Sequence, residues 1–224
     1  MATYLYGLIL ARNAHLVPAH ITGIDGTPVR VVACDGLDAL VSTLSRAPER
    51  SNLDDIRAHD RALQSVVHHG STAAATRFGQ SFSTDNDVRQ DVARRSGRVA
   101  KLLDEFDGCV EMRLLVAITP APSPQHSAIP AERAAGPGRA YLESLRDATP
   151  GDRVKGMGLR SALGPMVRAE RVEELPHARG AVFAHLVRRG DEPAYREAVA
   201  SQPALAAAMV VGPLALYSFA EGAE

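Results

Sequence analysis

A single Asp-Gly pair between two apolar runs restricts the N-terminal part of this 224-residue chain to a small set of folds. Residues 29–34 and 37–44 are rich in aliphatic side chains, and only Asp35 and Gly36 separate them. A two-residue turn between antiparallel strands needs positive φ at both central positions, which explains the preference for Asp-Gly there. The spacing therefore predicts a β-hairpin.

The first apolar run, residues 3–11, is predicted to form a central strand of a sheet. Tyr4, Tyr6 and Leu8 are expected on one face of this strand, and Leu5 and Ile9 on the other. Because both faces are apolar, the strand is predicted to be buried on both sides.

Two amphipathic helices follow the hairpin. The first runs for about four turns after an N-cap at Ser51 or Asn52, and its predicted buried face carries Leu53, Ile56, His59, Leu63 and Val66. The second spans about residues 86–107, with an extended segment at 73–82 before it and a strand at 109–118 after it. This order predicts a ferredoxin-like α+β sandwich with an extra strand and both helices on one sheet face.

The composition changes after this first unit. Five of the 14 prolines fall between residues 119 and 138, which predicts a linker or surface loop. Beyond it we expect helices at 139–148 and 152–168, strands at 172–175 and 181–188, a helix at 192–200 and a strand at 208–219, interrupted or placed at an edge by Pro213. The predicted domains are therefore an N-terminal modified ferredoxin-like domain, 1–119, a Pro-rich linker, 120–138, and a smaller C-terminal α+β domain, 139–224.

Charge and composition exclude several classes of function. The formal net charge is −1, which argues against non-specific nucleic-acid binding. No apolar stretch reaches the length of about 20 residues that a membrane span needs. The two cysteines, Cys34 and Cys109, form no CxxC pair and are expected to be buried free thiols. These observations predict a cytosolic protein.

Catalytic and cofactor motifs are absent from the sequence. It contains no GxGxxG, GxxxxGK[ST], GxSxG or HExxH pattern. The adjacent His68 and His69 are expected at a helix end, because successive helical side chains diverge by about 100° and cannot easily share a metal. We therefore predict no catalytic residue, no cofactor and no metal site.

Six short motifs, in consistent order from residue 4 to residue 219, give the chain a family resemblance. They are YLYG at 4–7, a helix histidine at His59, TRFG at 76–79, GCVEMRL at 108–114, GPGRAYL at 136–142 and GPLALYSF at 212–219. Together they resemble the F/L family of gas vesicle accessory proteins. The chain departs from that pattern at Ala75 or its neighbour, where a proline is usual, and at residues 214–216, which replace Trp-Pro-Pro.

The resemblance implies a non-enzymatic protein of gas vesicle formation, located in the cytoplasm and on the vesicle. Its implied partners are the small hydrophobic shell protein and other accessory proteins, with no small-molecule substrate. A partner could protect the shell protein by strand addition or through a groove for a helix. The implied contact residues are Arg77, Phe78, Gly79, Tyr141, Tyr217 and Phe219.

An enzymatic or ligand-binding ferredoxin-like protein is the alternative. Its candidate residues are His59, Arg77 and Arg113, which would have to meet in one polar pocket. An exposed sheet edge or an apolar patch near the domain junction would instead favour shell-protein binding.

Overall fold

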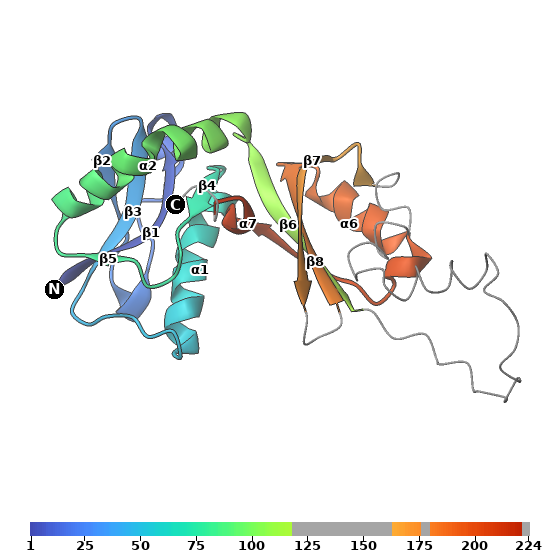
Figure 1. Cartoon of the computed structure of the whole chain (residues 1–224), viewed down its shortest axis with the longest axis horizontal. Coiled ribbons are helices and arrows are strands. Elements are labelled where there is room, and N and C mark those ends of the chain that lie inside the picture. The colour runs from blue at the N-terminus through green and yellow to red at the C-terminus, as the bar shows by residue number, and fades with distance from the viewer. Residues whose placement is uncertain (118–162, 176–179, 221–224) are drawn as a thin grey trace, which may run out of the picture.

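The computed structural model describes residues 1–117, 163–175 and 180–220, which form two antiparallel sheets with helices packed on them (Figure 1). The predicted α+β class is confirmed. The strands are β1 (Ala2–Leu10), β2 (Arg30–Cys34), β3 (Leu37–Leu44), β4 (Ala73–Ala75), β5 (Ser81–Phe82), β6 (Cys109–Ala117), β7 (Val167–Leu175), β8 (Gly180–Arg188) and β9 (Met209–Leu214). The helices are α1 (Leu53–His68), α2 (Asp85–Glu105), α6 (Glu192–Ala200) and α7 (Tyr217–Ala220), with 3₁₀ turns η1 (Ala11–Leu16), η2 (Ile24–Gly26) and η3 (Pro203–Leu205).

The first sheet has the order β2-β3-β1-β4, and β5 also pairs with β1. The predicted hairpin is confirmed: Asp35 and Gly36 have φ of 32° and 82°, and Cys34 pairs with Leu37. The predicted central strand is confirmed as β1, which has β3 on one side and β4 and β5 on the other.

A bulge in β1 changes which side chains share a face. Leu5 pairs with Val41 but Gly7 pairs with Leu40, so β1 holds one extra residue at this point. The extra residue reverses the alternation of side chains along the strand. Ile9 therefore joins the core of Tyr4 and Tyr6, while Leu8 joins that of Leu5. The prediction that Leu8 lies with the tyrosines was wrong for this reason.

The two N-terminal helices lie on opposite faces of the first sheet. Asn52 caps α1 by accepting a hydrogen bond from the Asp54 N–H, and Thr84 forms a capping box with Asp87 at the start of α2. The buried side of α1 packs with Tyr4 and Tyr6, whereas that of α2 packs with the opposite, Leu5 face. The expectation of both helices on one face was wrong, and the ferredoxin-like arrangement is not confirmed.

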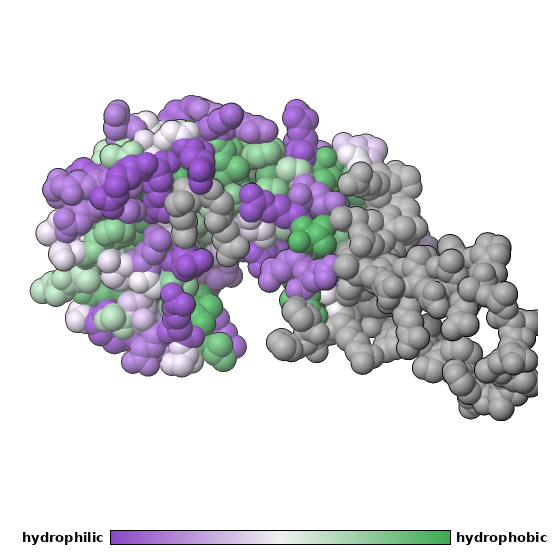
Figure 2. Space-filling view, in the orientation of Figure 1, coloured by the Kyte–Doolittle hydropathy of each residue, from purple (hydrophilic) through white to green (hydrophobic). Residues whose placement is uncertain are grey.

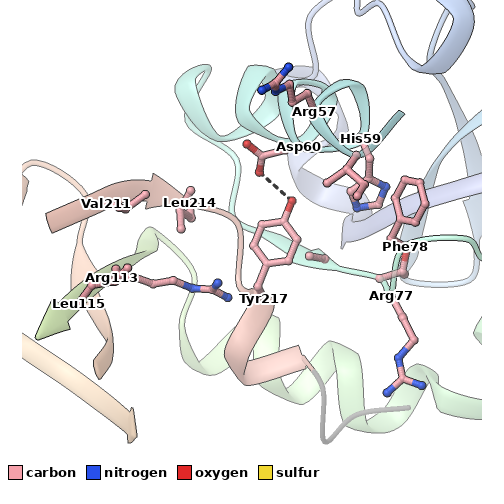
Figure 3. A pocket seen from close by; sticks show the side chains of 13 residues that line it. Arg57, His59, Asp60, Arg77, Phe78, Arg113, Leu115, Val211, Leu214 and Tyr217 are labelled. Carbon is pink, nitrogen blue, oxygen red and sulfur yellow. Dashed lines mark hydrogen bonds between the residues drawn. The ribbon is translucent and has the colours of Figure 1, made fainter. Parts of the chain in front are cut away.

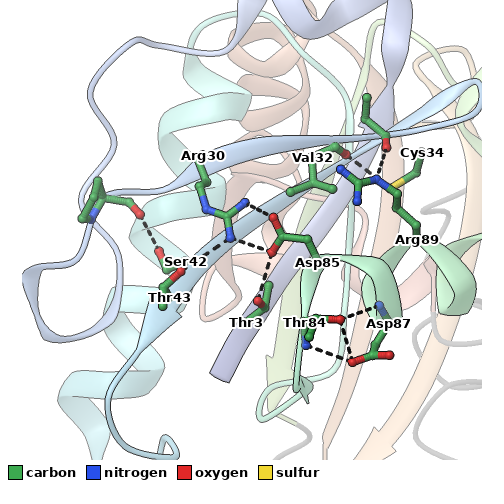
Figure 4. A network of polar contacts seen from close by, with 12 residues as sticks. Thr3, Arg30, Val32, Cys34, Ser42, Thr43, Thr84, Asp85, Asp87 and Arg89 are labelled. Atoms are coloured by element: carbon green, nitrogen blue, oxygen red, sulfur yellow. Dashed lines mark hydrogen bonds and ion pairs between the residues drawn. The ribbon is translucent and has the colours of Figure 1, made fainter. Parts of the chain in front are cut away.

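Polar contacts fasten the start of α2 to the sheet (Figure 4). Asp85 accepts two 2.7 Å hydrogen bonds from Arg30 and one of 3.0 Å from the Thr3 hydroxyl. One turn further on, Arg89 Nε donates to the Ala33 carbonyl of β2 at 3.2 Å. These bonds hold α2 across the edge strand of the sheet.

Strand β6 lies in the second sheet, whose order is β7-β8-β6-β9. The sequence order suggested that this strand, within the predicted domain 1–119, completes the first sheet. Instead it pairs with β8 from Cys109 to Ala117 and with β9 on its other side. A period-2 pattern identifies a strand but does not specify which strand it pairs with, so the sequence did not place β6 in the second sheet. The linker 120–138 and the helix 139–148 lie outside the described residues, as does the predicted helix 152–168 up to residue 162.

The C-terminal part agrees with the predicted order except at its end. The strands expected at 172–175 and 181–188 lie within β7 and β8, and the helix 192–200 is α6. Residues 167–168, expected to be helical, begin β7. The last strand stops at Leu214, since the chain crosses to the first sheet, where the Leu216 N–H donates to the Ala73 carbonyl at 2.8 Å. Residues from Tyr217 then form α7 instead of the predicted strand.

Hydrogen bonds join the two sheets at several points besides Leu216. The Thr72 hydroxyl donates to the Cys109 carbonyl at 3.1 Å, and Arg189 donates to the Val67 and Ser71 carbonyls at 2.6 and 3.2 Å. The buried cluster around Tyr4 and Tyr6 continues into β6 and β8. Cys34 and Cys109 are buried free thiols, as predicted.

Candidate functional site

The junction of the two sheets contains a cleft of about 540 Å³ (Figure 3). One wall comes from α1 and from the segment after β4, and the other from β6, β9 and α7. Its lining residues are Ile56, Arg57, His59, Asp60, Ala75, Thr76, Arg77, Phe78, Arg113, Leu115, Val211, Leu214 and Tyr217. Segments from both halves of the chain therefore build one site.

The rim of the cleft carries exposed apolar side chains on both walls. Ile56 on α1 is 37% exposed and Val211 on β9 is 36% exposed, although both are large aliphatic residues. Met209, two residues before Val211 on the same strand, is 57% exposed. Apolar surface is visible on both sides of the notch between the two sheets (Figure 2). Partly exposed apolar side chains therefore border the cleft on both walls, beside its charged residues.

The first apolar residues of α1 are more exposed than those of its later turns. Leu63 and Val66 are buried, as the spacing predicts, but Leu53 is 62% exposed and Ile56 is partly exposed. The prediction of a buried face over the whole helix was therefore wrong for Leu53 and Ile56.

His59 forms part of the inner wall and is almost fully buried. Its Nδ1 lies 2.9 Å from the Tyr4 hydroxyl, which itself accepts the Gly79 N–H at 3.2 Å. Donation from Tyr4 to Nδ1 satisfies both groups and leaves the proton on Nε2, which has no hydrogen-bond partner among the described residues. Burial lowers the pKa of His59 to about 4, so the ring is neutral at neutral pH.

Arg113 is held by a buried carboxylate behind the cleft. Its Nε donates to Glu111 Oε1 at 2.7 Å, and Glu111 is fully buried. Glu111 also accepts the Ser218 N–H and the Ser218 hydroxyl, both at 2.8 Å. The arginine is therefore charge-compensated, and the same carboxylate anchors the start of α7 to β6.

Tyr217 connects the two walls of the cleft. Its hydroxyl donates to Asp60 Oδ1 on α1 at 2.9 Å, and the Arg113 guanidinium lies 5.5 Å from the centre of its ring. Figure 3 shows the ring between Asp60 and Arg113, with His59 and Phe78 beyond it. Burial raises the pKa of Tyr217, so its hydroxyl remains a donor at neutral pH.

Arg77 differs from the other cations of the cleft because it makes no hydrogen bond or ion pair within the described parts of the chain. Its side chain is exposed and points away from His59 and Tyr217 (Figure 3). The neighbouring Phe78 is half-buried, with its ring in edge contact with His59 at 5.7 Å. Gly79, at φ of 95°, turns the chain so that its N–H reaches Tyr4.

The structure brings together part of the predicted contact set. Arg77, Phe78 and Tyr217 line the cleft, and Gly79 lies directly beside it. Phe219 is buried elsewhere, against Phe106 and under Arg171. Tyr141 lies outside the described residues. His59, Arg77 and Arg113, the residues of the enzymatic alternative, all line this same cleft.

Sequence reasoning missed the apolar residues of the second wall and missed Asp60 on α1, which accepts the Tyr217 hydroxyl. Leu115 and Val211 read as ordinary strand residues, and Leu214 stood only as a departure from the last motif, so the position of β9 beside α1 was not predictable from them. Asp60 had one available signal, because it follows His59 on a helix already singled out.

Within residues 1–117, 163–175 and 180–220, no three His, Cys, Asp or Glu side chains are grouped so that they could hold a metal ion. None of the described helices combines the length and the apolar character needed to cross a bilayer.

Comparison with solved structures defines the class of this fold. It superposes on the crystal structure of gas vesicle protein GvpF from Microcystis aeruginosa with a TM-score of 0.73 and 19% identity, over 98% of both chains. GvpF from an Anabaena species also gives 0.73, with 15% identity over 98% of this chain and 95% of that one. At these identities the likeness establishes the fold alone.

Sequence comparison establishes the family. The family model described as gas vesicle synthesis protein GvpL/GvpF matches residues 2–221. The chain therefore belongs to the GvpL/GvpF family of gas vesicle proteins. Gas vesicle protein L2 of Halobacterium salinarum is 29% identical over 110 residues, which are 47% of this chain but only 39% of that relative.

Proposed function

We propose that this protein is a non-enzymatic accessory factor of gas vesicle formation that binds the hydrophobic shell protein at the junction cleft. The observation that carries the proposal is the exposed apolar rim, with Ile56 on one wall and Val211 on the other. Burial of such side chains against a partner contributes roughly 25 cal/mol per Å² of apolar area. We place the protein in the cytoplasm and on the growing vesicle, alongside other accessory proteins.

The enzymatic alternative is supported by one observation, the meeting of His59, Arg77 and Arg113 in the cleft. The surroundings of these residues favour a protein-binding role over catalysis. His59 is neutral and its Nδ1 is occupied by Tyr4, while Arg113 is compensated by Glu111. The Thr76 hydroxyl already donates its proton to backbone carbonyls of β1. The proposed role therefore needs no substrate, cofactor or catalytic residue.

A matched pair of valine variants tests the proposal. Val211 on β9 and Val31 on β2 are both edge-strand valines with similar exposure, 36% and 38%, but only Val211 lines the cleft. In a pull-down with purified shell protein, Val211→Asp should reduce capture strongly and Val31→Asp should not. In a deletion strain that expresses each variant, Val211→Asp should impair vesicle formation and Val31→Asp should not. Absence of capture by the wild-type protein, together with normal vesicles in the deletion strain, would contradict the proposal.

A further inference from the structure

Arg113 is held in one orientation at the wall of the cleft. Its Nε donates to Glu111 at 2.7 Å, its Nη2 donates to the Ser218 hydroxyl at 3.2 Å, and its Cζ lies 5.5 Å from the centre of the Tyr217 ring. Within the described residues Nη1 makes no hydrogen bond, so N–H groups of a fixed guanidinium fork are left over. The side chain is 34% exposed, which makes these donors available to a ligand that enters the cleft.

Apolar side chains lie beside this guanidinium on the same face of the second sheet. Arg113 is opposite Val211 in the pairing of β6 with β9, and Leu115 follows it by two residues on β6. Opposed residues of paired strands share a face, as do residues two apart on one strand. Both aliphatic residues line the cleft, and Ile56 lines it from α1. A ligand that pairs with Arg113 would therefore lay an apolar body on these three residues.

The charges of the cleft limit how much negative charge such a ligand carries. Three arginines line the cleft together with one carboxylate, Asp60. Glu111 and the exposed Asp54 add two further carboxylates, each beside one of these arginines. Because the formal charges of these six groups balance, a polyanion such as a nucleoside triphosphate would find no excess of cations. A single carboxylate needs only the N–H donors that Arg113 offers.

We propose that the cleft is a binding site for a small amphipathic monocarboxylate, held through its carboxylate by Arg113 and through its apolar body by Leu115, Val211 and Ile56. The volume of 540 Å³ falls within the range of about 300–1,000 Å³ that is usual for small-molecule sites. The proposal concerns binding and includes no reaction of the ligand. It is independent of the proposed function, because the site is built from residues of this chain alone.

Displacement of a fluorescent probe from the purified protein tests the proposed site. Anilinonaphthalene sulfonate, which joins an aromatic body to one negative charge, should bind and gain fluorescence. Octanoate should displace the probe. Octanol has an alkyl chain of the same length but no charge, so it should be at least about tenfold less effective, as expected when charge-assisted hydrogen bonds are lost. Failure of octanoate to displace the probe, or equal displacement by octanol, would overturn the inference.

Two arginines on one sheet face supply matched variants. Arg113 and Arg171 both donate to Ser218, the first to its hydroxyl and the second to its carbonyl, but of the two only Arg113 lines the cleft. Arg113→Lys keeps a positive charge beside Glu111 and removes the guanidinium fork, so the affinity for octanoate should fall by about tenfold. Arg171→Lys should leave the affinity unchanged. Equal affinities of Arg113→Lys and the wild type would contradict the role of Arg113.

Thermal unfolding shows whether the two arginine variants fold. If Arg113→Lys does not, Val211→Asp replaces it, with Val31→Asp as its control. A carboxylate at position 211 would repel octanoate and remove apolar contact, so only Val211→Asp should lose octanoate binding. Equal binding by these two valine variants would overturn the inference. Capture of the shell protein is measured separately, so a protein that captures it but does not bind octanoate refutes this site and leaves the proposed function intact.

Discussion

The Tyr217 hydroxyl donates a 2.9 Å hydrogen bond to Asp60 Oδ1 across 157 positions of sequence. This bond connects α7, at the end of the described chain, with α1 on the far wall of the cleft. The Arg113 guanidinium over the same ring adds a contact with β6. One tyrosine thus links three elements across the cleft.

Tyr217→Phe should destabilise the fold by about 1–2 kcal/mol, because the ring packing remains but a partly buried hydrogen bond to a carboxylate is lost. Chemical denaturation measures the change. In a double-mutant cycle with Asp60→Asn, the two effects should be non-additive, since both substitutions act on one bond. Simple additivity would show that the hydroxyl and the carboxylate do not interact in solution.

Glu111→Gln should lower the free energy of unfolding by about 3 kcal/mol, which is more than the loss expected for Tyr217→Phe. The substitution leaves Arg113 without its buried counter-charge and weakens two hydrogen bonds from Ser218. The midpoint of urea unfolding measures the loss. Glu173→Gln, on the exposed charged strand β7, is the matched control and should change stability by less than about 0.5 kcal/mol. Equal effects of the two variants would contradict the role assigned to Glu111.

The pH dependence of stability should contain a contribution from His59. Its pKa is about 4 in the folded protein and about 6.5 when exposed, so the unfolded state binds the proton first as the pH falls. The wild type should therefore lose up to about 3 kcal/mol between pH 7 and pH 4 from this group.

His59→Gln keeps an acceptor for Tyr4 but does not titrate, so its stability should fall less over the same pH range. The difference between the two proteins isolates His59 from His185, whose pKa is also lowered by burial. An identical pH dependence of the two proteins would mean that His59 is not buried as a neutral ring.

Two glycines should respond to alanine with opposite signs. A Cβ at Gly7 would lie 2.7 Å from the Ala74 carbonyl oxygen and 2.8 Å from Leu63 Cδ2, so Gly7→Ala should destabilise the fold by about 1–3 kcal/mol. Gly97 lies inside α2 with open space around it, so Gly97→Ala should stabilise by roughly 0.5–1 kcal/mol. Thermal unfolding of both variants checks the pair; a tolerated Gly7→Ala would show that β1 and β4 can separate without cost.

Local patterns predicted the elements well where neighbouring residues decide the backbone. The Asp35-Gly36 turn and the Asn52 cap depend on side chains within a few residues of the groups they satisfy. The faces of β1 were predicted less well, because its bulge depends on pairing with β3. Nothing in the alternation of Leu5, Leu8 and Ile9 marks the extra residue.

The candidate site was predicted only in part for a related reason. His59, Arg77, Phe78 and Tyr217 stood in recognisable motifs, and all four line the cleft. Val211 carried no sequence signal and Leu214 was noted only as a departure from the last motif, because the place of both in the cleft comes from β9 lying beside α1. Phe219 shared a motif with Tyr217 but turns into a separate core, since residues two apart on a helix point in different directions.

By itself the sequence determined most of the described elements, the α+β class and the family, because turns, caps and short motifs are encoded by residues close together in the chain. The tertiary structure alone decided that β6 belongs to the second sheet and that α1 and α2 cover opposite faces of the first. It also decided that an exposed arginine and two apolar walls border one cleft. Contacts across more than a hundred residues depend on which strands pair, and hydrophobic periodicity does not specify a strand's partner.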